Sequence, residues 1–277
     1  MRYRVITDSS ANLFSLADVD FAAVPLKIIT EEKEYTDDAF LDVPAMVHEV
    51  ERTKGSSGTS CPNAFDWLSA FEGAERIIVL TLTGNLSGSY QAAQAAAEEY
   101  MENHPAAKVC VLDTRSAGPE IQLIVEKVRE WILSGMEFEE IIAEIERYKN
   151  RTHLLFSLES LRNLANNGRV SPGVAKVARV LGIRIVGAAS EEGTLEPLHK
   201  CRGEKRAWRG IFAEMEQRGF CGGRVRIAHC FNETASEELK EAILDRYPEA
   251  EVTIISCGGL CSFYAERGGL LVGFEGS

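Results

Sequence analysis

The chain has 277 residues, of which 45% are hydrophobic and 26% are charged, so it is long enough to bury one large core or two modest ones. Its formal net charge of −12 argues against binding to nucleic acid or to an anionic membrane surface, because both depend on clustered Lys and Arg. We expect a cytoplasmic protein with no membrane span, since no apolar run approaches ~20 residues and residues 1–8 enter a strand without the features of a signal peptide.

In the first half, apolar runs alternate with amphipathic segments, which predicts strands and helices in turn. Strands are predicted over residues 4–7, 22–29, 77–82 and 108–112. Helices are predicted over residues 43–53, 62–72, 91–102, 117–133 and 137–149. The acidic segment 31–42 is interpreted as mostly solvated. This alternation predicts an α/β domain with three layers, in which helices cover both faces of a parallel sheet.

The second half predicts a mixed sheet with helices. Strands are predicted over residues 154–157, 183–188, 195–201, 225–230, 252–256 and 270–274, and helices over 158–165, 205–217 and 236–246. The turn at 190–193 predicts an antiparallel hairpin. Asn167 and Gly168 are expected to end one helix in the left-handed conformation, and Ser171 and Pro172 to begin the next. With the boundary placed near Asn150, the chain divides into α/β domains at 1–150 and 151–277.

Two hydroxyl-rich loops, Gly58–Pro62 and Thr83–Ser89, are each expected to begin a helix. In parallel sheets, ligands bind beyond the carboxyl ends of the strands, which is where we place both loops. Backbone N–H groups at a helix N-terminus attract an anion, and the absence of lysine favours a weakly charged one such as a carboxylate. The candidate ligand-binding residues of these loops are Thr59, Ser60, Asn85, Ser87, Gly88 and Ser89.

Each of these residues also has a purely structural interpretation. Ser87 can be the N-cap of the following helix, because serine is a preferred cap. Thr59 and Ser60 can cap the helix that Pro62 begins. Arg169, which follows a turn, can be an ordinary surface arginine. The functional interpretation depends on the combination of the two loops with Arg169.

Other classes of site lack their signatures. Seven cysteines are scattered along the chain, and the close pair Cys257 and Cys261 has no second pair of ligands nearby, so we predict no metal site. The glycine-rich motifs that bind nucleotide phosphates are absent, so we predict no cofactor. A serine hydrolase needs its nucleophile in Gly-x-Ser-x-Gly, whereas the glycines around Ser87 are Gly84 and Gly88.

The order and spacing of several motifs resemble the DegV family of bacterial fatty-acid-binding proteins over essentially the whole chain. The matching segments are Ile6–Leu13, Val24–Leu26 with Tyr35, Thr59–Pro62, Leu86–Gln91, Leu161–Ser171 and Lys200–Gly203. The sequence departs from the family pattern near its end, where Tyr264 takes the position of the family's histidine in His-x-Gly-Pro-Gly.

The resemblance implies a carrier that is not an enzyme and that holds one long-chain fatty acid between its two domains, with the tail in an apolar tunnel. Thr59 and Ser87 would hold the carboxylate, with Arg169 near the head group or the docking surface. A partner fatty-acid kinase would then phosphorylate the carboxylate to an acyl phosphate. Tyr264 can donate a hydrogen bond there, and Glu266 is expected to bring negative charge to the same place.

Two further functions remain as alternatives. One is an α/β hydrolase of acyl esters that uses Ser87 as its nucleophile. The other is a regulatory protein that binds a different small carboxylate. The identity of the ligand would separate both from the fatty-acid carrier.

Overall fold

The structure is a computed structural model that describes residues 3–53, 55–170, 174 and 182–277. A parallel sheet in the order β2-β1-β6-β7 forms the centre of the first half; its strands are β1 (Tyr3–Asp8), β2 (Asp20–Val24), β6 (Arg76–Thr81) and β7 (Lys108–Asp113). The middle of β6 is fully buried, as is typical of strands covered on both faces. This explains why continuous apolar runs predicted these strands.

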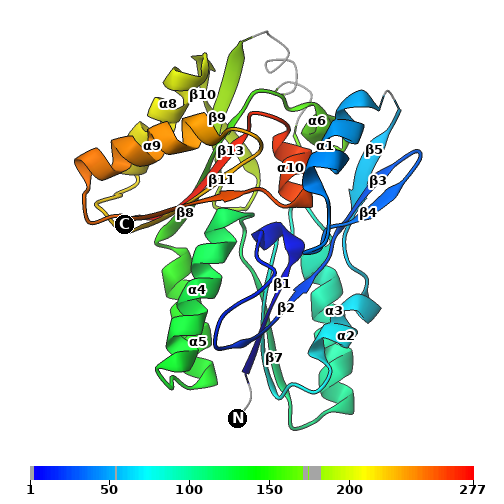
Figure 1. Ribbon diagram of the computed structural model, residues 1–277. Coiled ribbons are helices and arrows are strands. Elements are labelled where there is room, and N and C mark those ends of the chain that lie inside the picture. The colour runs from blue at the N-terminus through cyan, green and yellow to red at the C-terminus, as the bar shows by residue number, and fades with distance from the viewer. Residues whose placement is uncertain (1–2, 54, 171–173, 175–181) are drawn as a thin grey trace.

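Helices cover both faces of the parallel sheet, as predicted. Helices α2 (Ala64–Phe71) and α3 (Ser89–Asn103) pack against one face through Ile77 and Val79. Helices α4 (Pro119–Leu133) and α5 (Phe138–Lys149) pack against the other through Ile78 and Leu80. Alternate residues of β6 therefore serve two separate cores, and the three layers are visible in the lower part of Figure 1.

The apolar run 22–29 is two strands, whereas the sequence predicted one. It breaks at Pro25, which has no N–H for a sheet ladder: β2 ends at Val24, and β3 (Lys27–Thr30) begins a separate antiparallel sheet. The order of this small sheet is β4-β3-β5, with β4 at Glu34–Thr36 and β5 at Ser57–Ser60. Helix α1 (Val43–Arg52) shares a core with this sheet.

The predictions around the first hydroxyl-rich segment were wrong in two respects. Thr59 and Ser60 lie on β5 of the small sheet and not in a loop at the end of a parallel strand. Pro62 lies outside α2, because Asn63 is the N-cap of that helix and forms a capping box with Asp66. Neither Thr59 nor Ser60 therefore caps a helix.

The second half forms a six-stranded mixed sheet in the order β10-β9-β8-β13-β11-β12. Its strands are β8 (Thr152–Leu158), β9 (Ile183–Ala189), β10 (Leu195–Arg202), β11 (Arg224–His229), β12 (Glu251–Ser256) and β13 (Leu270–Glu275). The predicted antiparallel hairpin is β9–β10. Helices α8 (Glu204–Gln217) and α9 (Glu233–Arg246) share a core with Leu155 of β8.

The opposite face of the mixed sheet meets the first half of the chain. Helix α10 (Gly259–Ala265), which the sequence did not predict, packs on this face together with α1. Helix α6 (Arg162–Asn166) ends as predicted, because Gly168 adopts a left-handed φ of 72°. The predicted helix start at Ser171 and Pro172 lies outside the described residues.

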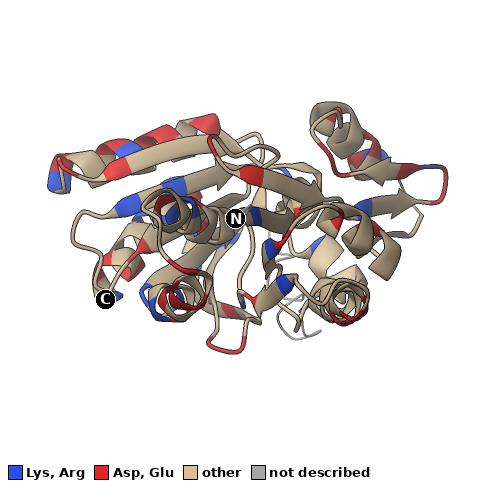
Figure 2. Ribbon diagram, turned by 90° about the horizontal axis from the view of Figure 1, so that it is seen from below, with Lys and Arg blue, Asp and Glu red and all other residues tan. Residues whose placement is uncertain are grey.

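Charged side chains are interspersed over the surface. Figure 2 shows acidic and basic positions mixed along the helices and strands, with no single basic face in that view. Within the described ranges, no helix is long and apolar enough to cross a membrane.

Candidate functional site

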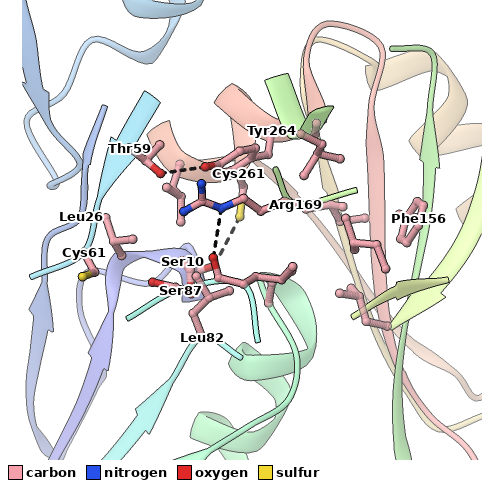
Figure 3. A pocket seen from close by; sticks show the side chains of 18 of the residues that line it. Ser10, Leu26, Thr59, Cys61, Leu82, Ser87, Phe156, Arg169, Cys261 and Tyr264 are labelled. Atoms are coloured by element: carbon pink, nitrogen blue, oxygen red, sulfur yellow. Dashed lines mark hydrogen bonds between the residues drawn. The ribbon is translucent and has the colours of Figure 1, made fainter. Parts of the chain in front are cut away.

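A cavity of about 270 Å³ lies between the mixed sheet and the loops of the first half. Leu154, Phe156 and Leu158 of β8 form one wall, because alternate side chains of a strand point to the same face. Leu26 and Leu82 contribute to the opposite wall. Most of the cavity is therefore apolar, as Figure 3 shows.

One end of the cavity is polar and collects most of the predicted site residues. Thr59, Ser60, Ser87, Gly88, Arg169 and Tyr264 all line the same cavity. The hydroxyls of Thr59 and Tyr264 lie 2.7 Å apart and form a hydrogen bond between residues 205 positions apart in the chain. Arg169 is the only charged side chain among the described residues that line the cavity.

Asn85 and Ser89, also predicted site residues, do not line the cavity. The amide of Asn85 donates a hydrogen bond to the backbone carbonyl of Glu192 at the tip of the β9–β10 hairpin. Ser89 is fully buried, and its hydroxyl donates to Asp8 at 2.5 Å. Both residues hold the loop in place instead of facing the ligand space.

The buried carboxylate of Asp8 holds both ends of the second hydroxyl-rich loop, Thr83–Ser89, by hydrogen bonds. Its carboxylate accepts hydrogen bonds from the backbone N–H groups of Ser10 and Leu82 at 3.2 and 2.9 Å and from the hydroxyls of Ser10 and Ser89. Burial raises the pKa of this carboxyl, whereas the four donors favour its charged form. Asp8 thus joins the ends of β1 and β6 to the start of α3.

Ser87 is not the cap of α3, because the N-cap position belongs to Gly88. Its Oγ accepts a hydrogen bond from the N–H of Ser89 at 3.2 Å, so its own O–H can be donated elsewhere. Gly88 is exposed, and a side chain there would approach the sulfur of Cys61 to 3.1 Å. The two hydroxyl-rich segments are therefore neighbours at the mouth of the cavity.

Sheet register turns Thr59 inward. In the small sheet Thr59 pairs with Ile28, whose side chain is fully buried, so both side chains lie on the inner face. Ser60 pairs with Lys27, which is half-exposed and forms an ion pair with Glu34.

Arg169 belongs to a turn that contacts both β5 and the Thr83–Ser89 segment. Its Nε donates to the backbone carbonyl of Leu86 at 3.2 Å, and the amide of Asn167 donates to the carbonyl of Ser57 at 3.1 Å. A second guanidinium N–H donates to the carbonyl of Asn167, which orients the group. The structure therefore does not support the interpretation of Arg169 as an ordinary surface arginine.

Helix α10 supplies Leu260, Cys261 and Tyr264 to the cavity wall, and its start depends on Asp37. The carboxylate of Asp37 accepts hydrogen bonds from the N–H groups of Gly259 and Leu260 at 2.7 and 3.0 Å. A side chain at Gly259 would lie 2.7 Å from that carboxylate, so only glycine allows this approach. Asp37 lies in the acidic segment that was interpreted as mostly solvated, yet it is buried.

Glu266 does not bring negative charge to the cavity, contrary to expectation. Its carboxylate accepts hydrogen bonds from the hydroxyl of Ser160 at 2.8 Å and the N–H of Asn163 at 3.1 Å, and it lies 3.6 Å from Arg162. These contacts hold the Glu266 carboxylate at the start of α6, and Glu266 does not line the cavity. Across the described part of the chain, no group of three or more His, Cys, Asp or Glu is placed to hold a metal ion.

Comparisons with known proteins agree over the full length of the chain. The model of the DegV family, described as an uncharacterised protein, matches residues 2–275. A DegV domain-containing protein of Streptococcus pneumoniae strain R6 is 42% identical over 279 residues, which cover 99% of each chain.

Two solved structures of DegV proteins are also similar. The Streptococcus pneumoniae Fatty Acid Kinase (Fak) B3 protein loaded with linoleic acid has a TM-score of 0.98 at 42% identity, with 100% of both chains covered. A DegV family protein from Eubacterium eligens loaded with heptadecanoic acid has a TM-score of 0.97 at 42% identity, covering 99% of this chain and 100% of its own.

Replacing Asp8 by alanine should lower the free energy of unfolding by about 2–4 kcal/mol, because two buried backbone N–H groups lose their acceptor. Urea denaturation measures this change. Asp245→Ala at an exposed position of α9 is the matched control and should change stability by less than about 0.5 kcal/mol. Equal effects of the two substitutions would contradict the role given to Asp8.

Asp37 should make stability depend on pH. Burial raises the pKa of its carboxyl from 3.8 to about 6. Because the folded-state pKa is the higher one, the stability contributed by the protonated form is present below pH 4 and is lost as pH rises through about 6. Between about pH 4 and 7, the unfolding free energy of the wild type should fall by about 2 kcal/mol relative to Asp37→Asn. Parallel pH profiles of the two proteins would contradict this expectation.

Proposed function

The chain belongs to the DegV family, and on that basis we propose that it binds a long-chain fatty acid and presents the carboxylate to a fatty-acid kinase, which converts it to an acyl phosphate. The observation that carries this proposal is the shape of the cavity: a long apolar wall ends at the hydroxyls of Thr59, Ser87 and Tyr264 and at Arg169. In this proposal, residues 1–150 carry the head-group loops and residues 151–277 carry most of the apolar wall.

The tail supplies most of the binding free energy in this proposal. Burial of an acyl chain contributes about 0.8 kcal/mol per methylene, so a sixteen-carbon chain gains on the order of 10 kcal/mol before the costs of association. The leucines of β8 and the facing leucines of the loops provide the necessary apolar surface. The similar structures loaded with linoleic and heptadecanoic acid support a ligand of this class.

The head group needs hydrogen bonds more than it needs a strong counter-charge. A buried carboxylate without partners is costly, and neutral hydroxyls and N–H groups can replace its water. If Tyr264 donates to Thr59 Oγ1, the Thr59 hydroxyl is directed to the ligand; Ser87 can donate as well. Arg169 adds one positive charge at the same end.

The kinase would approach from the mouth of the cavity. Cys61 and Gly88 are exposed there, next to Thr59 and Ser87, so the head-group end reaches the surface. The kinase would hold a nucleoside triphosphate. A carboxylate oxygen would form a bond to the γ-phosphorus while the bond from that phosphorus to the β,γ-bridging oxygen breaks, and the nucleoside diphosphate would leave on the kinase. In this proposal the chain itself does no chemistry and uses no cofactor.

The alternative of a hydrolase gains no support at Ser87. Among the described residues that line the cavity there is no histidine, and the Ser87 Oγ accepts the Ser89 N–H. The test is turnover of a short-chain ester. We expect none above background; turnover that disappears in Ser87→Ala would favour the hydrolase over the carrier.

Native mass spectrometry of the gently purified protein is the direct test of the carrier. We expect a co-purified mass that corresponds to a long-chain fatty acid. Added palmitic or oleic acid should also bind to the delipidated protein. Failure of both measurements would overturn the proposed function.

Thr59→Ala combined with Ser87→Ala should reduce acyl-phosphate formation by the kinase by tenfold or more while weakening fatty-acid binding only a few-fold, since the tail carries the affinity. Binding is measured by equilibrium competition and phosphorylation by acyl-phosphate trapping. Ser69→Ala on the exposed side of α2 is the control for loss of a hydroxyl. Equal losses of binding and phosphorylation would contradict this division between tail and head group.

A further inference from the structure

We infer that Leu154 is the partition that sets the longest acyl chain the cavity accepts. The inference rests on the proposed function, since it concerns the tail end of the same fatty-acid site. Its basis is the position of Leu154, which lines two different cavities at once. One is the apolar cavity described above, and the other is a polar cleft.

The polar cleft has a volume of about 670 Å³ and, apart from Leu154, is lined by different residues. The charged residues that line it are three basic ones, Arg115, Lys149 and Arg218, and four acidic ones, Glu120, Glu146, Glu191 and Glu196. Among the described residues, Leu154 is the only one that lines both cavities. Leu154 therefore lies between an apolar space and a charged one.

Among the residues of β8 that line the cavity, Leu154 is the farthest along the strand from α6 and the Arg169 turn. Strand β8 runs from Thr152 to Leu158 and leads directly to α6 and the Arg169 turn. At about 3.3 Å per residue, Leu154 is roughly 13 Å from Leu158 along the strand. The pairing with β13 agrees with this orientation. Leu270, the first residue of β13, follows closely after Tyr264 in the chain and pairs with Ser157, so this end of β8 is the one near the head group.

The neighbouring strand cannot help Leu154 to close the cavity. Its partner in β13 is Gly273, which has no side chain. A Cβ at Gly273 would lie 2.5–2.7 Å from the backbone of Pro119 and Glu120 at the start of α4, so this position must remain glycine. At this level of the sheet, β13 contributes no side chain and the start of α4 packs directly against its backbone, so Leu154 is the side chain that the β8–β13 pair supplies to the cavity wall.

The flanking segments divide between the two cavities in the same way. Ala117 and Leu195 line the apolar cavity, whereas Arg115 and Glu196, one or two residues away, line the polar cleft. The polar side is also held in place: Lys149 donates to the carbonyl of Asp113 at 2.6 Å. The lining therefore changes from apolar to charged at three places: at Leu154, between Ala117 and Arg115, and between Leu195 and Glu196.

This geometry predicts a limit in chain length. Each methylene that lies within the apolar cavity should tighten binding about fourfold. Once the tip reaches Leu154, a further methylene must bend back or enter the charged cleft, where it is no longer removed from water. The affinity should then stop rising with chain length.

The experiment measures dissociation constants for saturated acids from lauric to behenic acid with the delipidated full chain. For the wild type we expect an increase of about fourfold per methylene up to a limiting length, followed by less than twofold per methylene. In Leu154→Ala the limit should move to acids about two to four carbons longer, because the chain can pass the shortened side chain.

Leu158→Ala is the matched control. It removes the same atoms from the same face of the same strand, but it lies near the head-group end and away from the polar cleft. We expect it to change affinity at all lengths without moving the limit. Leu154→Phe should move the limit to shorter acids, which keeps the inference testable if Leu154→Ala is too unstable to purify.

The outcomes are distinct. An unchanged limit in a folded Leu154→Ala or Leu154→Phe protein overturns the inference, as does an equal shift in Leu158→Ala. If the wild type binds none of the acids, the proposed function itself fails. Shifts in opposite directions for the two Leu154 variants, with the limit unmoved in Leu158→Ala, support the partition.

Discussion

The buried carboxylate of Asp8 is the constraint on which the polar end of the cavity depends. A carboxylate removed from water must have its oxygens satisfied, and here the donors come from the turn after β1, the end of β6 and the first residue of α3. Two of those residues, Ser10 and Leu82, also line the cavity. The position of the Ser87 loop is therefore set by a polar interaction beneath the site and not by the site itself.

The cavity separates two tasks that a fatty acid requires. The period of two along β8 gives one face to the core under α8 and α9 and the other to the ligand space, so a single strand supports both. Affinity then comes from non-directional apolar burial, whereas orientation of the carboxylate comes from a few hydroxyls at one end. A lysine is unnecessary, because the hydroxyls, N–H groups and Arg169 already replace water around a singly charged group.

Three polar residues were ambiguous because each had a local explanation. Ser87 and Thr59 resembled helix caps, yet the caps are Gly88 and Asn63. Arg169 resembled a solvated arginine, yet it donates to a carbonyl 83 positions away. What unites the three is a tertiary contact: the turn after α6 contacts β5 and the Ser87 loop together. The left-handed Gly168 makes this turn possible.

The sequence by itself determined the elements that have a clear local pattern, such as an apolar run or a turn motif. Strand β6 is covered on both faces, so its continuous apolar run was enough to predict a strand. The turn at residues 190–193 was enough to predict the β9–β10 hairpin. The motif resemblance also identified the cavity residues Thr59, Ser87 and Arg169. The break between β2 and β3 at Pro25 has a cause in the sequence, because proline has no N–H for a sheet ladder. The tertiary structure alone decided the existence of α10 and the burial of Asp37, which caps a helix 222 positions away. Hydrophobic periodicity reports which face of a segment is buried, but it carries no information about which distant segment covers that face. The meeting of Thr59 with Tyr264, and the place of Leu154 between two cavities, therefore had to come from packing.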